Sequence, residues 1–188
     1  MPFSPLARCL AAAALCSFSV HAQTARQPLQ RHTLTYAPGR SITLSLPANL
    51  DFEYSAVGHG HLDMAWLWPL RETRRKSART YARALRMIDD HDGYIYGTSQ
   101  PQQLLWMKQD HPALYERLKR AVAAGRLELQ GSFWVETDTN MPGGESLVRQ
   151  SLVGRHFLAA EFGLTPAEMW LCWLPDTFWS SGTLPEIL

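Results

Sequence analysis

The sequence has almost no excess of either charge, few cysteines and only one long apolar run. Its 18 Lys and Arg residues against 17 Asp and Glu residues give a net charge of +1 over 188 residues. A protein that coats nucleic acid needs a basic excess on at least one face, so this balance argues against a nucleic-acid partner. Hydrophobic residues make up 46% of the chain, which is enough for a packed core and argues against a disordered protein.

The long apolar run lies at the N-terminus and is too short to cross a bilayer. Arg8 precedes residues 10–20, and small side chains at Val20 and Ala22 match the −3 and −1 positions of a cleavage site. This pattern predicts a signal peptide over residues 1–22 and therefore a secreted or periplasmic protein without a membrane span after cleavage. A buried N-terminal strand or helix is the alternative interpretation.

Cleavage after Ala22 also changes the charge and the cysteine content. It removes Arg8, Cys9 and Cys16, which leaves 17 basic and 17 acidic residues and the lone Cys172. An internal disulfide is then excluded, and stability must come from packing. We expect residues 23–50 to be a linker and an irregular N-terminal segment, and residues 51–188 to form the folded part.

From residue 54 onward, the sequence alternates between predicted strands and helices. Apolar and β-branched runs predict strands at residues 54–58, 94–96, 127–135 and 169–174. Helical periodicity covers residues 72–89, 102–124 and 145–162, with a break near Pro112 and glycine caps at Gly125 and Gly163. The βαβαβαβ order predicts an α/β fold with a parallel sheet, either open or part of a barrel. The basic side of the helix at 72–89 is interpreted as a solvated face.

Polar residues follow each predicted strand, where parallel α/β folds place their sites. His59, His61 and Asp63 alternate along an extended segment and point the same way, which favours a divalent metal, with zinc as the first candidate. A satisfied polar pair is the alternative for such a short motif. Asp176 follows the fourth predicted strand, where a carboxylate is a ligand, a nucleophile or a helix cap. Trp66 and Trp68 are suited either to stacking on a sugar or to core packing.

Six segments in this order resemble the motifs of glycoside hydrolase family 38, the zinc-dependent retaining α-mannosidases. They are residues 58–69 (GHGHLDMAWLWP), 99–103 (SQPQQ), 134–138 (WVETD), 144–150 (GESLVRQ), 173–178 (WLPDTF) and 184–188 (LPEIL). The resemblance implies a (β/α)-barrel of the family 38 type, of which residues 51–188 would form about the first half. It implies a chain that binds a mannoside or glycan, and it carries no indication of the oligomeric state.

The resemblance also implies roles for individual residues. His61, Asp63 and Asp176 match zinc ligands, Asp176 also matches the nucleophile, and Trp66 matches the aromatic residue against the mannose ring. His59 and Asp138 are expected to support the ligands from behind without binding the metal. One Zn²⁺ per site is expected, with a fourth ligand, a His, and the acid/base, an Asp, beyond residue 188.

The implied function is hydrolysis of terminal α-linked mannose from glycans through a glycosyl-enzyme on Asp176, with the 188-residue chain inactive alone. A non-catalytic carbohydrate-binding remnant is one alternative. A zinc amidohydrolase, which also begins with His-x-His, is disfavoured because the later strand ends lack His or Lys. The chain has Trp179 where the family usually has Gly and Glu186 where it usually has Gln. We expect Trp179 to strain the turn or to obstruct the pocket.

Overall fold

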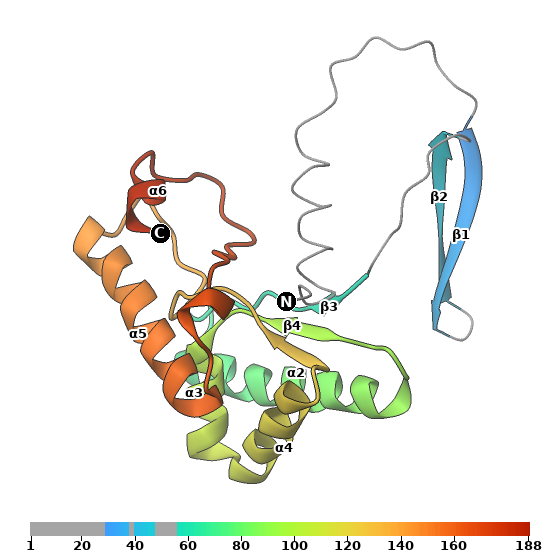
Figure 1. The fold of residues 1–188 in the computed structure, drawn as a ribbon, viewed down its shortest axis with the longest axis horizontal. Helices are drawn as coiled ribbons and strands as arrows, with labels where there is room; N and C mark the ends of the chain where they lie inside the picture. The colour runs from blue at the N-terminus through green and yellow to red at the C-terminus, as the bar shows by residue number, and fades with distance from the viewer. Residues whose placement is uncertain (1–28, 38–39, 48–55) are drawn as a thin grey trace. The chain divides into compact units, whose positions relative to one another are not determined.

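The computed structural model describes residues 29–37, 40–47 and 56–188 of the chain (Figure 1). The chain divides into two units, residues 1–56 and residues 57–188. The predicted signal peptide lies outside the described residues. Within the described ranges, no helix combines the length and the apolar character needed to cross a membrane.

The first unit contains a β-hairpin where we expected irregular structure. Strand β1 (Leu29–Ala37) pairs antiparallel with β2 (Arg40–Pro47), with Leu29 opposite Pro47 and Thr33 opposite Thr43. The hydroxyls of Thr33 and Thr43 lie 3.3 Å apart across this pair. Alternating Thr, Ser and apolar residues in both strands are the period-2 signal that sequence reasoning overlooked.

The second unit is a three-stranded parallel sheet connected by helices, as the α/β prediction requires. Strands β3 (Gly58–His59), β4 (Tyr96–Thr98) and β5 (Leu127–Leu129) lie in the order β3-β4-β5, with Gly58 opposite Tyr96 and Tyr96 opposite Leu127. The helices are α2 (Leu70–Asp90), α3 (Pro101–Asp110), α4 (Pro112–Ala123), α5 (Gly144–Phe162) and α6 (Leu184–Ile187), with a 3-10 turn η1 (Pro166–Glu168) before α6. Figure 1 shows α2, α3 and α4 on the same side of the sheet, below it in this view.

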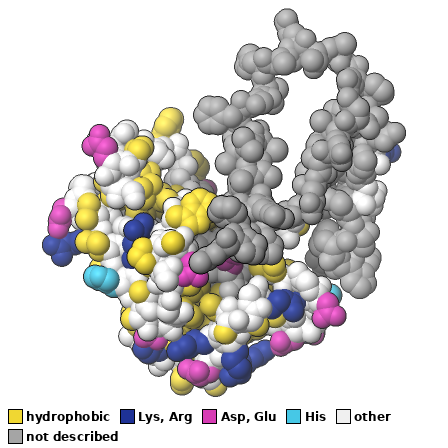
Figure 2. Space-filling view, viewed as in Figure 1, with side chains coloured by type: hydrophobic (Ala, Val, Ile, Leu, Met, Phe, Trp, Pro, Cys, Tyr) yellow, Lys and Arg dark blue, Asp and Glu magenta, His cyan; other side chains and the backbone are white. Residues whose placement is uncertain are grey.

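The core lies between this sheet and the helices that cover it. Hydrophobic residues at most 1% exposed come from α2, α3, α4, α5 and β5: Tyr81, Leu104, Met107, Leu118, Leu127 and Leu158. The outer helix surfaces carry ion pairs, including Arg74 with Asp110 at 2.6 Å and Arg117 with Asp89 at 2.7 Å. Figure 2 shows Lys and Arg side chains beside Asp and Glu along this lower edge, in line with the predicted solvated face.

The predicted helices are confirmed, and local sequence signals explain their ends. The break near Pro112 separates α3 from α4, because proline cannot continue the hydrogen-bond ladder of the preceding helix. Gly125 follows α4 with φ 68°, and the N–H of Arg126 reaches the carbonyl of Ala121 at 2.9 Å, a Schellman cap. Gly163 ends α5 with φ 71°.

The strands differ more from prediction than the helices do. The predicted fourth strand at 169–174 is wrong: this segment forms no strand, and Trp170 is 61% exposed rather than buried on both faces. It runs past Gly131, where a Cβ would lie 3.4 Å from the backbone nitrogen of Trp173. The third strand stops at Leu129 rather than Val135, because Gly131 turns the backbone to φ 74°.

The two earlier strands are shifted relative to their predicted positions. The second covers Tyr96–Thr98 instead of 94–96. The first is described at Gly58–His59, and residues 54–55 of its predicted span lie outside the described residues. The three parallel strands establish the order of the sheet, and closure of a whole barrel stays a prediction.

Candidate active site

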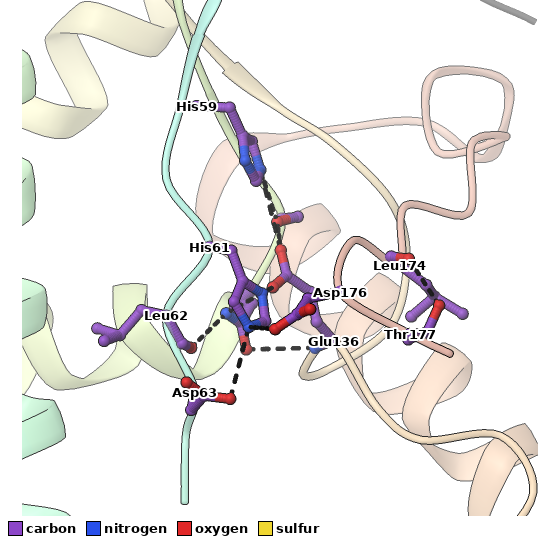
Figure 3. Close-up of polar contacts among 10 residues, drawn as sticks. His59, His61, Leu62, Asp63, Glu136, Leu174, Asp176 and Thr177 are labelled. Atoms are coloured by element: carbon purple, nitrogen blue, oxygen red, sulfur yellow. Dashed lines mark hydrogen bonds and ion pairs between the residues drawn. The ribbon is translucent and has the colours of Figure 1, made fainter. Parts of the chain in front are cut away.

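Three predicted metal-ligating side chains meet in space. The chain beyond β3 carries His61 and Asp63, and the segment after the 3-10 turn η1 brings Asp176 beside them. One ligand atom from each of these residues lies within 4.8 Å of the others. His61 Nε2 is 3.5 Å from Asp63 Oδ1 and 3.6 Å from Asp176 Oδ2. Figure 3 shows both carboxylates turned toward the same edge of the His61 ring.

Asp176 occupies a tight turn and has a left-handed backbone. Its φ of 54° is the only positive value among the non-glycine residues that the structure describes, and Asp tolerates this conformation better than most residues. Thr177 closes the turn by donating from Oγ1 to the carbonyl of Leu174 at 2.9 Å. The Asp176 side chain remains 57% exposed and thus accessible to a ligand.

The strain expected at Trp179 lies at Asp176 instead. Trp179 has no positive φ, and its side chain is 79% exposed. Its carbonyl accepts a hydrogen bond from Thr139 at 3.5 Å. The backbone therefore accommodates Trp179 without the left-handed turn that would favour glycine.

Glu136 lies behind His61, and sequence reasoning gave it no role. Its carboxylate, with the side chain 1% exposed, accepts a hydrogen bond from His61 Nδ1 at 2.5 Å. Ser99 Oγ donates to Glu136 Oε1, and Gln100 Nε2 donates at 3.1 Å to Oε2, the oxygen that also accepts from His61. Gln100 Nε2 also donates to the carbonyl of Leu62 at 2.9 Å, which connects Glu136 to the segment between His61 and Asp63.

Burial and charge shift the pKa values of this cluster in opposite directions. Burial raises the pKa of Glu136 and outweighs its hydrogen bonds from Ser99 and His61. Burial alone would lower the pKa of His61, but the hydrogen bond and the negative charge of Glu136 raise it above its usual value. Burial, followed by the charge of His61, lowers the pKa of His59. His59 is therefore a neutral hydrogen-bonding group at neutral pH.

The two residues expected behind the ligands have different surroundings. His59 Nε2 is 3.1 Å from Ser99 Oγ and 3.8 Å from a Glu136 oxygen, so His59 joins the network behind His61. Asp138 is exposed, and its carboxylate accepts hydrogen bonds from the backbone N–H groups of Asn140 at 2.7 Å and Met141 at 2.9 Å. The structure does not bring Asp138 into the cluster; these bonds hold a turn.

Comparison with known proteins assigns the chain to a family. Residues 51–188 match the N-terminal domain of the glycosyl hydrolases of family 38. The chain belongs to glycosyl hydrolase family 38. It is 45% identical over 133 residues to human alpha-mannosidase 2C1 and 41% identical over 133 residues to alpha-mannosidase G of Dictyostelium discoideum, in each case over 71% of this chain.

A solved structure and the lengths of the relatives complete this comparison. The crystal structure of an alpha-mannosidase from Enterococcus faecalis superimposes with a TM-score of 0.60 at 28% identity, over 69% of this chain and 14% of that one. The chain spans 12% of the length of the curated relatives it matches. Membership of family 38 does not support the amidohydrolase alternative.

The donor atoms of this family 38 chain fit a divalent metal such as zinc. An imidazole nitrogen and two carboxylates are ligands that zinc accepts, and three protein ligands leave a position open. In a tetrahedral site with bonds of about 2.0–2.1 Å, neighbouring ligand atoms lie about 3.3 Å apart. The 3.5 and 3.6 Å separations between His61 Nε2 and the two carboxylates are close to this value. Three carboxylates around one histidine also attract a cation.

Two exposed aromatic residues lie close in the sequence to the metal-ligand candidates of this family 38 chain. Trp66 is 61% exposed, and Phe178, two residues after Asp176, is 81% exposed. Trp68, in contrast, donates from Nε1 to Thr73 Oγ1 at 2.8 Å, and the Lys76 ammonium lies 3.1 Å from the centre of its ring. Trp66 is therefore free to stack on a ligand, whereas Trp68 already packs within the protein.

Proposed function

We propose that the whole protein is a zinc-dependent retaining α-mannosidase that hydrolyses terminal α-linked mannose from glycans. The observation that carries this proposal is the convergence of His61, Asp63 and Asp176 within 4.8 Å in a chain of family 38. Relatives with 39–45% identity are named alpha-mannosidases. Because the chain spans 12% of their length, the activity is proposed for the whole protein.

His61, Asp63 and Asp176 would hold the metal, and Trp66 would stack on the mannose ring. When bound, the ion supplies a positive charge and a template for the sugar hydroxyls. Asp176 Oδ2 is the oxygen nearest His61 Nε2, which leaves Oδ1 for the substrate. The exposure of Asp176 leaves room for a sugar to approach this oxygen.

The reaction proceeds in two displacements at the anomeric carbon. An Asp176 oxygen attacks that carbon while its bond to the leaving oxygen breaks, and the leaving oxygen takes a proton from a second carboxylic acid. Water, deprotonated by this second group, then releases mannose from Asp176 with overall retention. The family resemblance places the second carboxylic acid beyond residue 188, so we expect no turnover from the 188-residue chain alone.

The N-terminal pattern supports a proposed location outside the cytoplasm. Arg8, the apolar residues 10–20 and the small residues Val20 and Ala22 form the three parts of a signal peptide. We propose that the protein is secreted or periplasmic. N-terminal sequencing of the exported protein tests this, with a start at Gln23 expected and an intact Met1 contrary to it.

The experiment that tests the activity follows hydrolysis of an aryl α-mannoside by the full-length protein with proton NMR. We expect α-mannose as the first product, loss of activity with a chelator and recovery with zinc. Release of β-mannose would contradict the retaining mechanism. Binding of mannosides without hydrolysis would favour the carbohydrate-binding remnant instead.

A further inference from the structure

The His61 ring presents its two nitrogens to different groups. Nδ1 lies 2.5 Å from a Glu136 oxygen, whereas Nε2 lies 3.5 and 3.6 Å from the carboxylates of Asp63 and Asp176. A proton on Nδ1 is thus donated to Glu136, and the lone pair on Nε2 faces the two aspartates (Figure 3). This tautomer follows from the hydrogen-bond network around the ring.

Glu136 is itself held by groups from several parts of the chain. Ser99 and Gln100 follow β4, and they donate to its two carboxylate oxygens. Gln100 Oε1 accepts the backbone N–H of Glu136 at 3.2 Å, while its Nε2 donates to the carbonyl of Leu62. The carboxylate is therefore fixed relative to the backbone that carries His61 and Asp63. Such a buried, fully bonded acceptor suits a positioning group better than a reacting group.

We propose that Glu136 is a positioning residue, which holds His61 in the Nδ1–H tautomer and aims Nε2 at the metal position between Asp63 and Asp176. This inference rests on the proposed metal site and adds a residue to it. A carboxylate that accepts the second N–H of a histidine ligand fixes the ring and raises its basicity. Loss of such a partner typically weakens metal binding by about 10- to 100-fold.

Substitutions at Glu136 separate this role from a purely structural one. Glu136→Ala removes the acceptor, and we expect zinc to bind about 10- to 100-fold more weakly. Glu136→Gln keeps an oxygen for Nδ1–H and an amide that can donate to Ser99, so it should retain most of the affinity. Glu128→Ala is the matched control, because Glu128 is a partly buried carboxylate on β5 outside the network, and its zinc affinity should equal that of the parent chain.

The test is a zinc titration of the full chain against a competing chelator, with unfolding midpoints of the metal-free variants measured alongside. If the zinc affinity is unchanged in Glu136→Ala, or is weakened equally in the alanine and glutamine variants, the inference about Glu136 is overturned while the proposed metal site stands. Failure of the parent chain to bind zinc would overturn the proposed site together with the inference.

A second measurement does not depend on the folding of any Glu136 variant. Long-range proton–nitrogen correlation spectra of the zinc-loaded parent chain report which His61 nitrogen binds zinc, and a His61→Gln variant identifies the signals. We expect zinc on Nε2 and a proton on Nδ1. Zinc on Nδ1 would overturn the inference.

Discussion

Gln100 connects Glu136 to the segment that carries His61 and Asp63, and its removal should weaken both the fold and the metal site. Gln100 is only 2% exposed, and its side chain makes three hydrogen bonds. They join Nε2 to the Leu62 carbonyl at 2.9 Å, Nε2 to Glu136 Oε2 at 3.1 Å, and Oε1 to the Glu136 backbone N–H at 3.2 Å. At about 1 kcal/mol each, Gln100→Ala should lower the free energy of unfolding by about 3 kcal/mol.

The nearly isosteric variant Gln100→Glu tests the electrostatic part of this account. It replaces a donor to Glu136 by a second carboxylate. Two like charges 4 Å apart interact by about 4 kcal/mol at an effective dielectric constant of 20. We therefore expect Gln100→Glu to destabilise the chain at pH 7 more than Gln100→Ala does.

Urea unfolding of the metal-free full chain measures these losses. With a slope of about 1–3 kcal/mol per molar urea, a loss of about 3 kcal/mol moves the midpoint by about 1–3 M. Gln102→Ala is the matched control: it loses one hydrogen bond, from Trp134 Nε1 at 3.0 Å, and should cost about 1 kcal/mol without affecting zinc binding. A Gln100→Ala chain as stable as Gln102→Ala, with full zinc affinity, would refute the reasoning.

Three further perturbations address the metal ligands, a close helix contact and an ion pair. Asp63→Ala should weaken zinc binding at least 10-fold in the same titration, whereas the exposed Asp92→Ala should not; equal affinity in both would remove Asp63 from the ligand set. Gly154→Ala would place a Cβ against the backbone of Ser132, so we expect about 1–3 kcal/mol of destabilisation by thermal or urea unfolding, with Gly144→Ala near neutral because its Cβ meets no neighbour. The Lys108 ammonium on α3 holds the pKa of Glu161 below its usual 4.5. The stabilisation that the Glu161 carboxylate contributes is therefore present above pH 4.5 and is lost as the pH falls further. Glu161→Gln should flatten this acid limb of the stability curve, and an unchanged limb would contradict the assignment.

Local signals were sufficient to predict the helices but not the strands. The break at Pro112 and the glycines at 125 and 163 act within one or two turns of the chain, so the sequence predicts them directly. The three strands of the parallel sheet have two or three residues each, too few for a clear alternation, and their pairing partners determine where they begin. The apolar run at 169–174 predicted a buried strand because it is continuous. Its actual path is determined by a tertiary contact, in which its backbone lies against Gly131.

The same distinction applies to the candidate site. The spacing of His61 and Asp63 is a local feature, and sequence reasoning alone could propose them as ligands. The part played by Glu136 depends on a contact with His61 across 75 residues, which no spacing reveals. Asp138 presents the opposite case, since it was expected to support the ligands and the structure places it in its own turn.

Covalent trapping of the full-length protein tests the central claim most directly. A fluorinated mannosyl fluoride that forms a slowly hydrolysed glycosyl-enzyme, followed by peptide mass mapping, identifies the nucleophile. The account predicts a single mannosyl adduct on Asp176, which disappears when a chelator removes the metal or when Asp176 is replaced by Ala. An adduct on another residue, or turnover of α-mannosides by the Asp176→Ala protein, would contradict it.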